Sequence, residues 1–175
     1  MTSGSLGGEP DRLWRVTSGE QAPATVDRLL RSLPQWFGID SAIAEYVVRA
    51  HELPTYLAWP APGLAVPDLE PQPVGVLLAV RHFPESAEIH LMAVEPAMRR
   101  RGIGQALVEA VEADLVADGV ELLQVKTLGP SLPDAGYSQT RKFYVHMGFR
   151  PLEEIPDLWP GNPCLIMVKA LRPSG

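Results

Sequence analysis

The stretch "RRRGIGQAL" (Arg99–Leu107) decides how this chain is interpreted, because it joins a strand pattern to a helix pattern. Three arginines lead into Gly102, and Gly104 follows one residue later. The first turn of a helix has unpaired N–H groups and a partial positive charge. Glycines let a bulky anion approach the backbone, and arginines bind phosphate oxygens through charge-assisted hydrogen bonds. The stretch therefore predicts a pyrophosphate-binding loop, with a plain solvated turn as the alternative.

Two other nucleotide-binding patterns do not fit this stretch. A dinucleotide fingerprint needs a third glycine where this chain has Leu107, and it opens directly off a strand. Here the segment 95–101 separates the strand pattern from Gly102. The sequence also contains no GxxxxGK[ST] string of the kind that forms a P-loop. A basic nucleic-acid site is disfavoured by the net charge of −6, because general nucleic-acid binders are usually basic.

Composition indicates one globular domain. The chain has 175 residues, 46% of them hydrophobic, which is enough for a full core. We expect a flexible tail over residues 1–10 and a single domain over 11–175. The single cysteine, Cys164, excludes an internal disulfide and a cysteine-rich metal cluster, and we expect no metal site. No apolar run reaches the roughly 18 residues of a membrane span, and the first residues lack a signal-peptide pattern. We therefore expect a cytoplasmic protein without membrane or nucleic-acid partners.

Hydrophobic periodicity predicts an α/β fold of the α+β type. Ser18 and Asp40 are expected to cap the first two helices, and Gly119 is expected to end the third. The predicted helices cover 20–33, 40–53, the opening stretch to about 118, and 138–147. The predicted strands cover 12–17, 55–60, 74–83, 87–94, 120–128, 149–155 and 164–171, and 60–73 and 129–137 are expected to be loops.

Three elements together resemble a known family. "RRRGIG" resembles the R/Q-x-x-G-x-G/A signature of the GCN5-related N-acetyltransferases (GNAT), with Arg99, Gly102 and Gly104 at its fixed positions. The strand "AEIHLMAV" (87–94) precedes it, and "FYVHMGF" (143–149) is similar to the family's later Y-x-x-x-G-F segment. The resemblance implies a single GNAT-like domain. Its sheet would be mixed and mostly antiparallel, with about seven strands, splayed in the middle and flanked by about four helices.

The resemblance implies acetyl-CoA as co-substrate. Its pyrophosphate would lie on the signature loop, formed by Arg99, Arg100, Arg101, Gly102, Ile103, Gly104 and Gln105. Its pantetheine arm would pair with the free edge of the preceding strand at Met92, Ala93 and Val94. The following strand, around 125–128, would diverge and leave a V-shaped cleft. An unpaired strand edge offers the N–H and C=O groups that the amides of the arm require.

The implied reaction, acetyl transfer to an amine, needs a general base for the amine and a general acid for the leaving thiolate. Tyr144, which matches the tyrosine of the family's motif, is the implied acid, and core packing is its alternative role. Glu88 stands where the histone-acetylating branch has its base; His90, a water chain or simple solvation are the alternatives. Strand alternation predicts that Glu88, His90, Met92 and Val94 share one face.

The acceptor side is expected to include Trp36, Phe37, Asp134 and Tyr137, from the early helices and the loop before the last helix. The family's asparagine in that last helix has no counterpart here. The sequence predicts an N-acetyltransferase for a primary amine of a small molecule, peptide or protein. A catalytically silent CoA-binding sensor or interaction domain is the alternative. The chain is expected to be a monomer or a homodimer, with 164–171 as a candidate edge strand.

Overall fold

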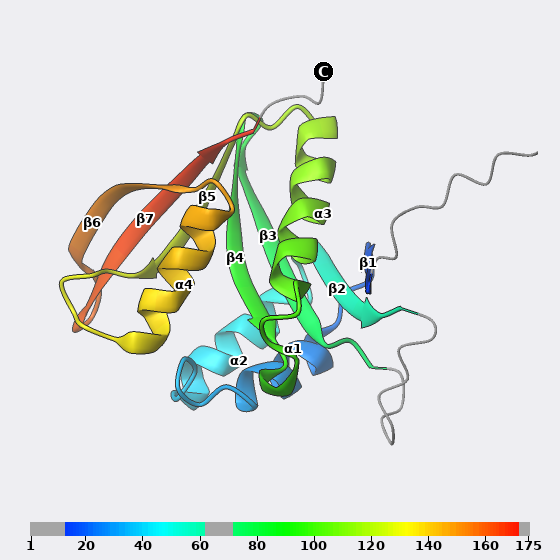
Figure 1. The fold of residues 1–175 in the computed structure, drawn as a ribbon, viewed down its shortest axis with the longest axis horizontal. Helices are drawn as coiled ribbons and strands as arrows, with labels where there is room; N and C mark the ends of the chain where they lie inside the picture. Colours follow the sequence, from blue (N-terminus) through cyan, green and yellow to red (C-terminus); the bar gives the residue numbers. More distant parts are fainter. Residues whose placement is uncertain (1–12, 62–71, 172–175) are drawn as a thin grey trace, which may run out of the picture.

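A computed structural model describes residues 13–61 and 72–171 (Figure 1). The predicted tail and most of the predicted 60–73 loop lie outside these residues. The helices of the described part are α1 (Pro23–Arg31), α2 (Asp40–Arg49), the short 3-10 helix η1 (Pro96–Met98), α3 (Ile103–Ala117) and α4 (Ala135–His146). Its strands are β1 (Trp14–Ser18), β2 (Thr55–Pro60), β3 (Gly75–Phe83), β4 (Ser86–Val94), β5 (Leu122–Leu128), β6 (Arg150–Trp159) and β7 (Asn162–Ala170).

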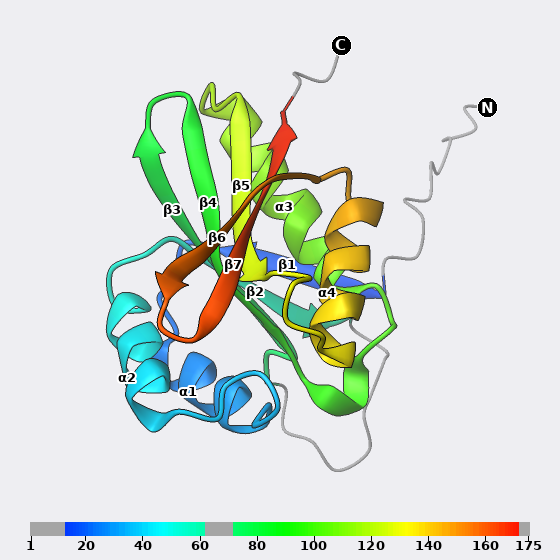
Figure 2. The same cartoon turned by 90° about the vertical axis from the view of Figure 1, so that its left-hand side faces the viewer.

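The seven described strands form one sheet in the order β1-β2-β3-β4-β5-β7-β6 (Figure 2). Only β4 and β5 are parallel, as the crossover through α3 requires, and every other neighbouring pair is antiparallel. The predicted fold class and the mostly antiparallel sheet of about seven strands are therefore confirmed. The suggestion that 164–171 is an edge strand is wrong, because β7 pairs with β5 on one side and β6 on the other.

Helices cover both faces of the sheet. On one face, α1 and α2 pack their apolar stripes against alternate residues of β2, β3 and β4. The stripe Val26, Leu29, Leu30 and Leu33 is buried, as its helical spacing predicts. On the other face, α3 and α4 pack against the larger core, which includes Leu77, Ile89, Leu123 and Met167.

The α3 helix begins and ends at glycines in the left-handed conformation. Gly102 is its N-cap at φ +81°, and Gly119 follows its C-cap at φ +78°. Because side-chain-bearing residues rarely adopt such angles, these two glycines set the length of the helix, as the sequence predicts for Gly119. Glu112 of α3 is half-buried, with its carboxylate 2.6 Å from the Lys169 ammonium of β7.

Other helix starts differ from the prediction. Ser18 is the last residue of β1, and α1 begins at Pro23 after an Ala22 N-cap. Asp40 is the first residue of α2 instead of its cap. The last helix begins three residues earlier than predicted, at Ala135, because the Asp134 side chain accepts a 2.8 Å hydrogen bond from the Tyr137 amide. A side-chain acceptor at the N-cap satisfies an otherwise unpaired N–H, so the cap fixes where the helix starts.

A bulge in β4 changes which residues share a face. In the register with β3, Leu78 pairs with Leu91 and Ala79 with Ile89, so His90 is the extra residue. Ile89 therefore belongs to the core under α3, whereas Leu91 belongs to the core under α1 and α2. The prediction that Glu88, His90, Met92 and Val94 share one face is wrong, since the alternation reverses at His90.

The sheet opens between β4 and β5 directly after this point. The two strands pair from Ser86↔Leu122 to Ile89↔Val125 and no further. Beyond Val125, β5 continues only with β7, through Lys126↔Ile166, Thr127↔Leu165 and Leu128↔Cys164. The remaining part of β4, Leu91–Val94, keeps its pairing with β3. Its other edge therefore faces a wedge, which confirms the predicted splay in the middle of the sheet.

Candidate active site

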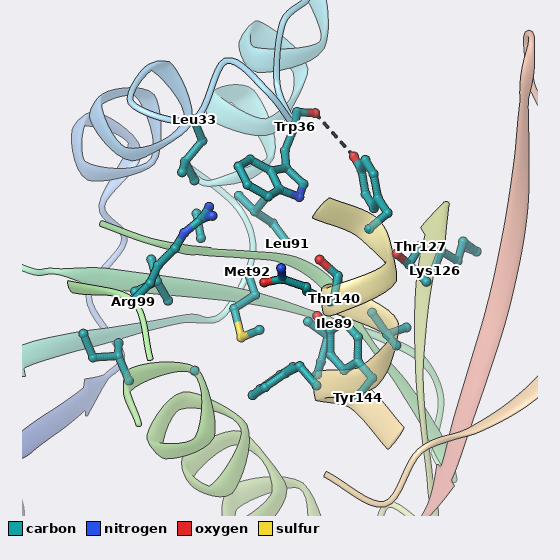
Figure 3. Close-up of a pocket in the computed structure, with 18 of the residues that line it drawn as sticks. Leu33, Trp36, Ile89, Leu91, Met92, Arg99, Lys126, Thr127, Thr140 and Tyr144 are labelled. Atoms are coloured by element: carbon teal, nitrogen blue, oxygen red, sulfur yellow. Dashed lines mark hydrogen bonds between the residues drawn. The ribbon is translucent and has the colours of Figure 1, made fainter. Parts of the chain in front are cut away.

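The wedge between β4 and β5 is part of a cavity of about 630 Å³ (Figure 3). Both splayed strands, α4, the start of α3 and the segment between α1 and α2 line it. The cavity brings together these predicted site residues: Trp36, Phe37, Glu88, His90, Met92, Ala93, Val94, Arg99, Arg100, Gly102, Ile103, Gly104, Gln105, Tyr137 and Tyr144. Residues more than a hundred positions apart in the sequence therefore line one continuous space.

Two predicted residues lie outside the cavity lining. The exposed Arg101 offers its carbonyl oxygen to the indole N–H of Trp14, so its backbone is used in tying β1 to the loop. The Asp134 carboxylate caps α4. Among the described residues, no group of three or more His, Cys, Asp or Glu side chains is arranged to hold a metal ion. No helix in the described ranges is long and apolar enough to cross a membrane.

The segment Arg99–Gln105 presents a helix N-terminus to the cavity. Arg100 has φ +60° and Gly102 φ +81°, so the chain turns sharply before α3 begins. No side chain caps this helix end. The first turn of α3 closes where the Ala106 amide donates a 3.0 Å hydrogen bond to the Gly102 carbonyl. The backbone N–H groups just before Ala106 have no partner within the helix, as at any helix start. Such free N–H groups, together with the helix dipole, favour the binding of an anion.

The two glycines of the signature serve different purposes. Gly102 has open space around a hypothetical Cβ, so its positive φ is what requires glycine there. A Cβ on Gly104 would lie 3.2 Å from the Phe143 ring and 3.7 Å from the Met92 methyl. Gly104 therefore lets α3 and α4 approach each other at the cavity floor, a packing role that the sequence pattern does not reveal.

Trp36 connects three parts of the cavity wall. The Arg99 guanidinium lies 4.0 Å from the centre of the Trp36 ring, a cation–π contact visible in Figure 3. Partial burial lowers the pKa of Arg99, which nevertheless stays charged at neutral pH. The Trp36 carbonyl accepts a 3.4 Å hydrogen bond from the Tyr137 hydroxyl. A Cβ on Gly136 would lie only 2.9 Å from the Trp36 ring, so α4 approaches it closely.

Tyr144 lies on the inner face of α4 and lines the cavity. Its ring meets those of Phe143 and Phe149 edge to face, with centroids 5.2 Å and 5.4 Å away. Burial raises the pKa of the Tyr144 phenol above its usual range, because the phenolate is poorly solvated there. The hydroxyl is therefore protonated at neutral pH. The Tyr144 ring packs in the core and the side chain also lines the cavity, so core packing does not exclude a role at the cavity.

Glu88 is buried at the closed end of the wedge. One of its carboxylate oxygens accepts from Gln124 Nε2 at 2.7 Å and Lys126 Nζ at 2.9 Å, and lies 2.8 Å from His82 Nε2. Burial alone raises the pKa of Glu88, but the hydrogen bonds from Lys126, His82 and Gln124 outweigh it, and the net pKa lies below its usual value. Glu88 is thus ionised at neutral pH and is not the simply solvated strand end considered above.

His90, the bulge residue, lies beside the Tyr46 ring, with centroids 5.4 Å apart. Burial lowers the pKa of His90, and the charge of Glu88 opposes that shift. At neutral pH the imidazole is therefore mostly uncharged and can accept a proton. Sequence reasoning missed Tyr46 as a cavity residue, and it placed the strand around 125–128 beside the cleft without singling out Lys126 or Thr127. No local sequence motif marks these residues. They line the cavity because the fold places α2 and β5 beside the bulge in β4.

Comparison with known proteins agrees with this architecture. The sequence model described as the acetyltransferase (GNAT) domain matches residues 65–151. No match was found among curated proteins. A GNAT-family protein from Desulfovibrio desulfuricans has a similar structure, with 19% identity, a TM-score of 0.72, and coverage of 91% of this chain and 98% of its own.

Two further solved structures show the same fold. The ribosomal-protein-S18-alanine N-acetyltransferase from Escherichia coli has 15% identity and a TM-score of 0.69, covering 93% of this chain and 96% of its own. A GNAT acetyltransferase from Elizabethkingia anophelis with acetyl-CoA bound has 17% identity and a TM-score of 0.64, and the match covers 91% of this chain and 99% of its own. From the signature loop, the splayed sheet and these matches, the chain belongs to the GCN5-related N-acetyltransferase (GNAT) family.

Proposed function

We propose that this protein transfers the acetyl group of acetyl-CoA to a primary amine. The observation that supports this most directly is the continuity of one cavity. It runs from the uncapped start of α3 with its arginines, along the unpaired edge of β4, to Tyr144 and Glu88 at the closed end of the wedge. A silent CoA-binding domain is the alternative function.

The cavity residues fit a CoA thioester. The amides of Gly102–Gln105, with Arg99 and Arg100, suit a pyrophosphate because a helix start and guanidinium groups both favour anions. The unpaired edge of Leu91–Val94 suits the two amides of a pantetheine arm. The related protein from Elizabethkingia anophelis binds acetyl-CoA with the same fold, which supports this assignment.

The residues at the closed end suit the two proton transfers. Tyr144, kept protonated by burial, is the proposed donor to the leaving thiolate. Glu88 is the proposed anchor for the amine or for a water molecule that takes its proton, as one of its oxygens is already occupied by three neighbours. His90 is the alternative proton acceptor, since its pKa is lowered and it is uncharged at neutral pH.

The acceptor side of the cavity is mainly aromatic, with Trp36, Phe37, Tyr46 and Tyr137. Among the described residues that line the cavity, Glu88 is the only carboxylate, and it is paired with Lys126. A polycation would gain little attraction from a paired carboxylate. The amines to be tested should therefore include monoamines, amino acids and peptide N-termini on one side, and polyamines and aminoglycosides on the other.

Binding and turnover together test the proposal. Calorimetry with acetyl-CoA, CoA and NAD is expected to show saturable binding of the first two and none of NAD. Thiol release from acetyl-CoA is then measured across the amine panel. Release that depends on an amine supports the enzyme, whereas tight binding without release with any amine supports the sensor. No binding of acetyl-CoA or CoA contradicts both functions.

Replacing Trp36 with alanine is expected to weaken CoA binding by about 3- to 30-fold, because the Arg99 guanidinium loses the ring that holds it at the cavity. Calorimetry at two salt concentrations measures the change. Trp59→Ala is the matched control: it also removes a cation–π contact, with Arg15 at 5.8 Å, but Trp59 does not line the cavity. Equal CoA affinity in Trp36→Ala and the wild type would remove Trp36 from this role.

A further inference from the structure

Thr127 of β5 has a buried hydroxyl without a protein partner. Its side chain lines the cavity, and the residue is only 4% exposed. Within the described residues, the Thr127 Oγ1 atom is the one buried side-chain polar atom that makes no hydrogen bond. Buried hydroxyls are usually paired, since leaving one unpaired is unfavourable. An unpaired hydroxyl on a cavity wall therefore points to a partner that is not part of the protein.

The position of Thr127 identifies which part of a ligand it faces. Val125 is the last β5 residue paired with β4, so Thr127 is the second residue beyond the point where the strands separate. On its other side it pairs with Leu165 of β7, which holds its backbone in place. Thr127 shares its face of β5 with Leu123 and Val125, which belong to the core under α3 and α4. It therefore faces the narrow end of the wedge, on the same side as Tyr144 (Figure 3).

The wide end of the wedge is the end where β4 runs into the Arg99–Gln105 segment, several residues beyond Leu91. A ligand whose pyrophosphate lies on that segment reaches the narrow end only with the far end of its extended arm. In a CoA thioester this end holds an amide carbonyl and the thioester carbonyl, both of which accept a hydrogen bond from a hydroxyl.

We propose that the Thr127 hydroxyl donates a hydrogen bond to a carbonyl oxygen at the acyl-pantetheine end of the co-substrate, which makes Thr127 a co-substrate-binding residue. This proposal rests on the proposed use of acetyl-CoA. It gives a hydrogen-bond partner to a hydroxyl that has none within the described protein. The sequence of this strand shows only hydrophobic alternation and does not mark Thr127 as a binding residue.

The test compares Thr127→Val, which keeps the β-branched shape and removes the hydroxyl, with Thr127→Ser, which keeps the hydroxyl. For the full-length protein, calorimetry measures binding of acetyl-CoA, CoA and the nucleotide half alone, 3′-phospho-ADP. Thr127→Val is expected to weaken binding of the pantetheine-containing ligands by about 5- to 50-fold and to leave 3′-phospho-ADP unchanged. Thr127→Ser is expected to restore most of the loss.

Thermal unfolding of the ligand-free protein adds a second measurement, in which the variant is expected to be no less stable although it binds the ligand more weakly. Because the hydroxyl lacks a protein partner, Thr127→Val is expected to raise Tm by about 2–6 °C or leave it unchanged. Weaker binding of acetyl-CoA alone assigns the hydroxyl to the thioester carbonyl, and weaker binding of CoA as well assigns it to the adjacent amide; both support the proposal.

Three outcomes overturn the proposal. One is wild-type affinity of Thr127→Val for acetyl-CoA and CoA. The second is an equal loss with 3′-phospho-ADP, which would indicate a general distortion. The third is a lower Tm, which would indicate a structural hydroxyl. If the wild type itself binds neither acetyl-CoA nor CoA, the proposed function fails first, so the two failures are distinguishable.

Discussion

Tyr144→Phe is expected to lower turnover by about 10²–10⁴-fold, the range typical of a lost general acid. The affinity for acetyl-CoA should change little, because the ring that packs against Phe143 and Phe149 is retained. The leaving thiolate would then have to take its proton from water. Steady-state turnover with the best amine of the panel, together with calorimetric binding of acetyl-CoA, measures the two effects separately.

Tyr56→Phe is the matched control for this experiment. Tyr56 is also a buried tyrosine, but it lies on β2 and does not line the cavity around Tyr144. Its loss of a hydroxyl should leave turnover within a few-fold of the wild type. Because burial raises the pKa of Tyr144, the wild-type rate should show no loss from phenol ionisation below about pH 10. An unchanged rate in Tyr144→Phe would assign proton donation to another group.

Glu88→Gln is expected to lower turnover by about 10²-fold and to move the acidic limb of the pH–rate profile to lower pH. The charge of Glu88 raises the pKa of His90 while burial lowers it. Removing that charge leaves burial and the neighbouring Arg49, Lys126 and His82, all of which lower the pKa of His90. The limb, which arises when His90 is protonated as the pH falls, should therefore move downwards.

The acidic limb of the pH–rate profile should not come from Glu88 itself. Its hydrogen bonds hold the pKa of Glu88 below the usual value, so its titration lies in the acid range. The stability that its ionised form contributes is present above the unfolded-state pKa and is lost as pH falls through the lower folded-state pKa. The Tm difference between wild type and Glu88→Gln should accordingly shrink in acid.

His90→Gln separates the two residues as proton acceptors. If His90 accepts the proton, this variant should lose the acidic limb while keeping wild-type affinity for acetyl-CoA. If the limb persists in His90→Gln and stays at the same pH in Glu88→Gln, neither side chain is the titrating group. A water chain or the amine itself would then be assigned the proton transfer, and Glu88 would be left with a role in holding the amine.

The residues for which sequence reasoning succeeded are those with local physical causes. The prediction that α3 ends at Gly119 is confirmed, because glycine readily adopts the positive φ angle needed there. The strand before the signature follows from hydrophobic periodicity, and the resemblance to the family pointed to Tyr144, which the structure places in the cavity lining. The helix start at Ala135 was missed, although Asp134 is a good N-cap residue, because the run of loop-forming residues before it suggested a longer loop.

The amino-acid sequence by itself determined the order of the elements, the end of α3 at Gly119, and the presence of Glu88 in the strand before α3 and of Tyr144 in the last helix. The tertiary structure decided which side chains meet. The bulge at His90 reverses the alternation of β4, and a bulge without glycine has no local sequence signal. The contacts of Trp36 with Arg99, and of Lys126 with Glu88, join residues from separate elements. Pairings of this kind depend on how the splayed sheet and its helices pack, which hydrophobic periodicity does not specify.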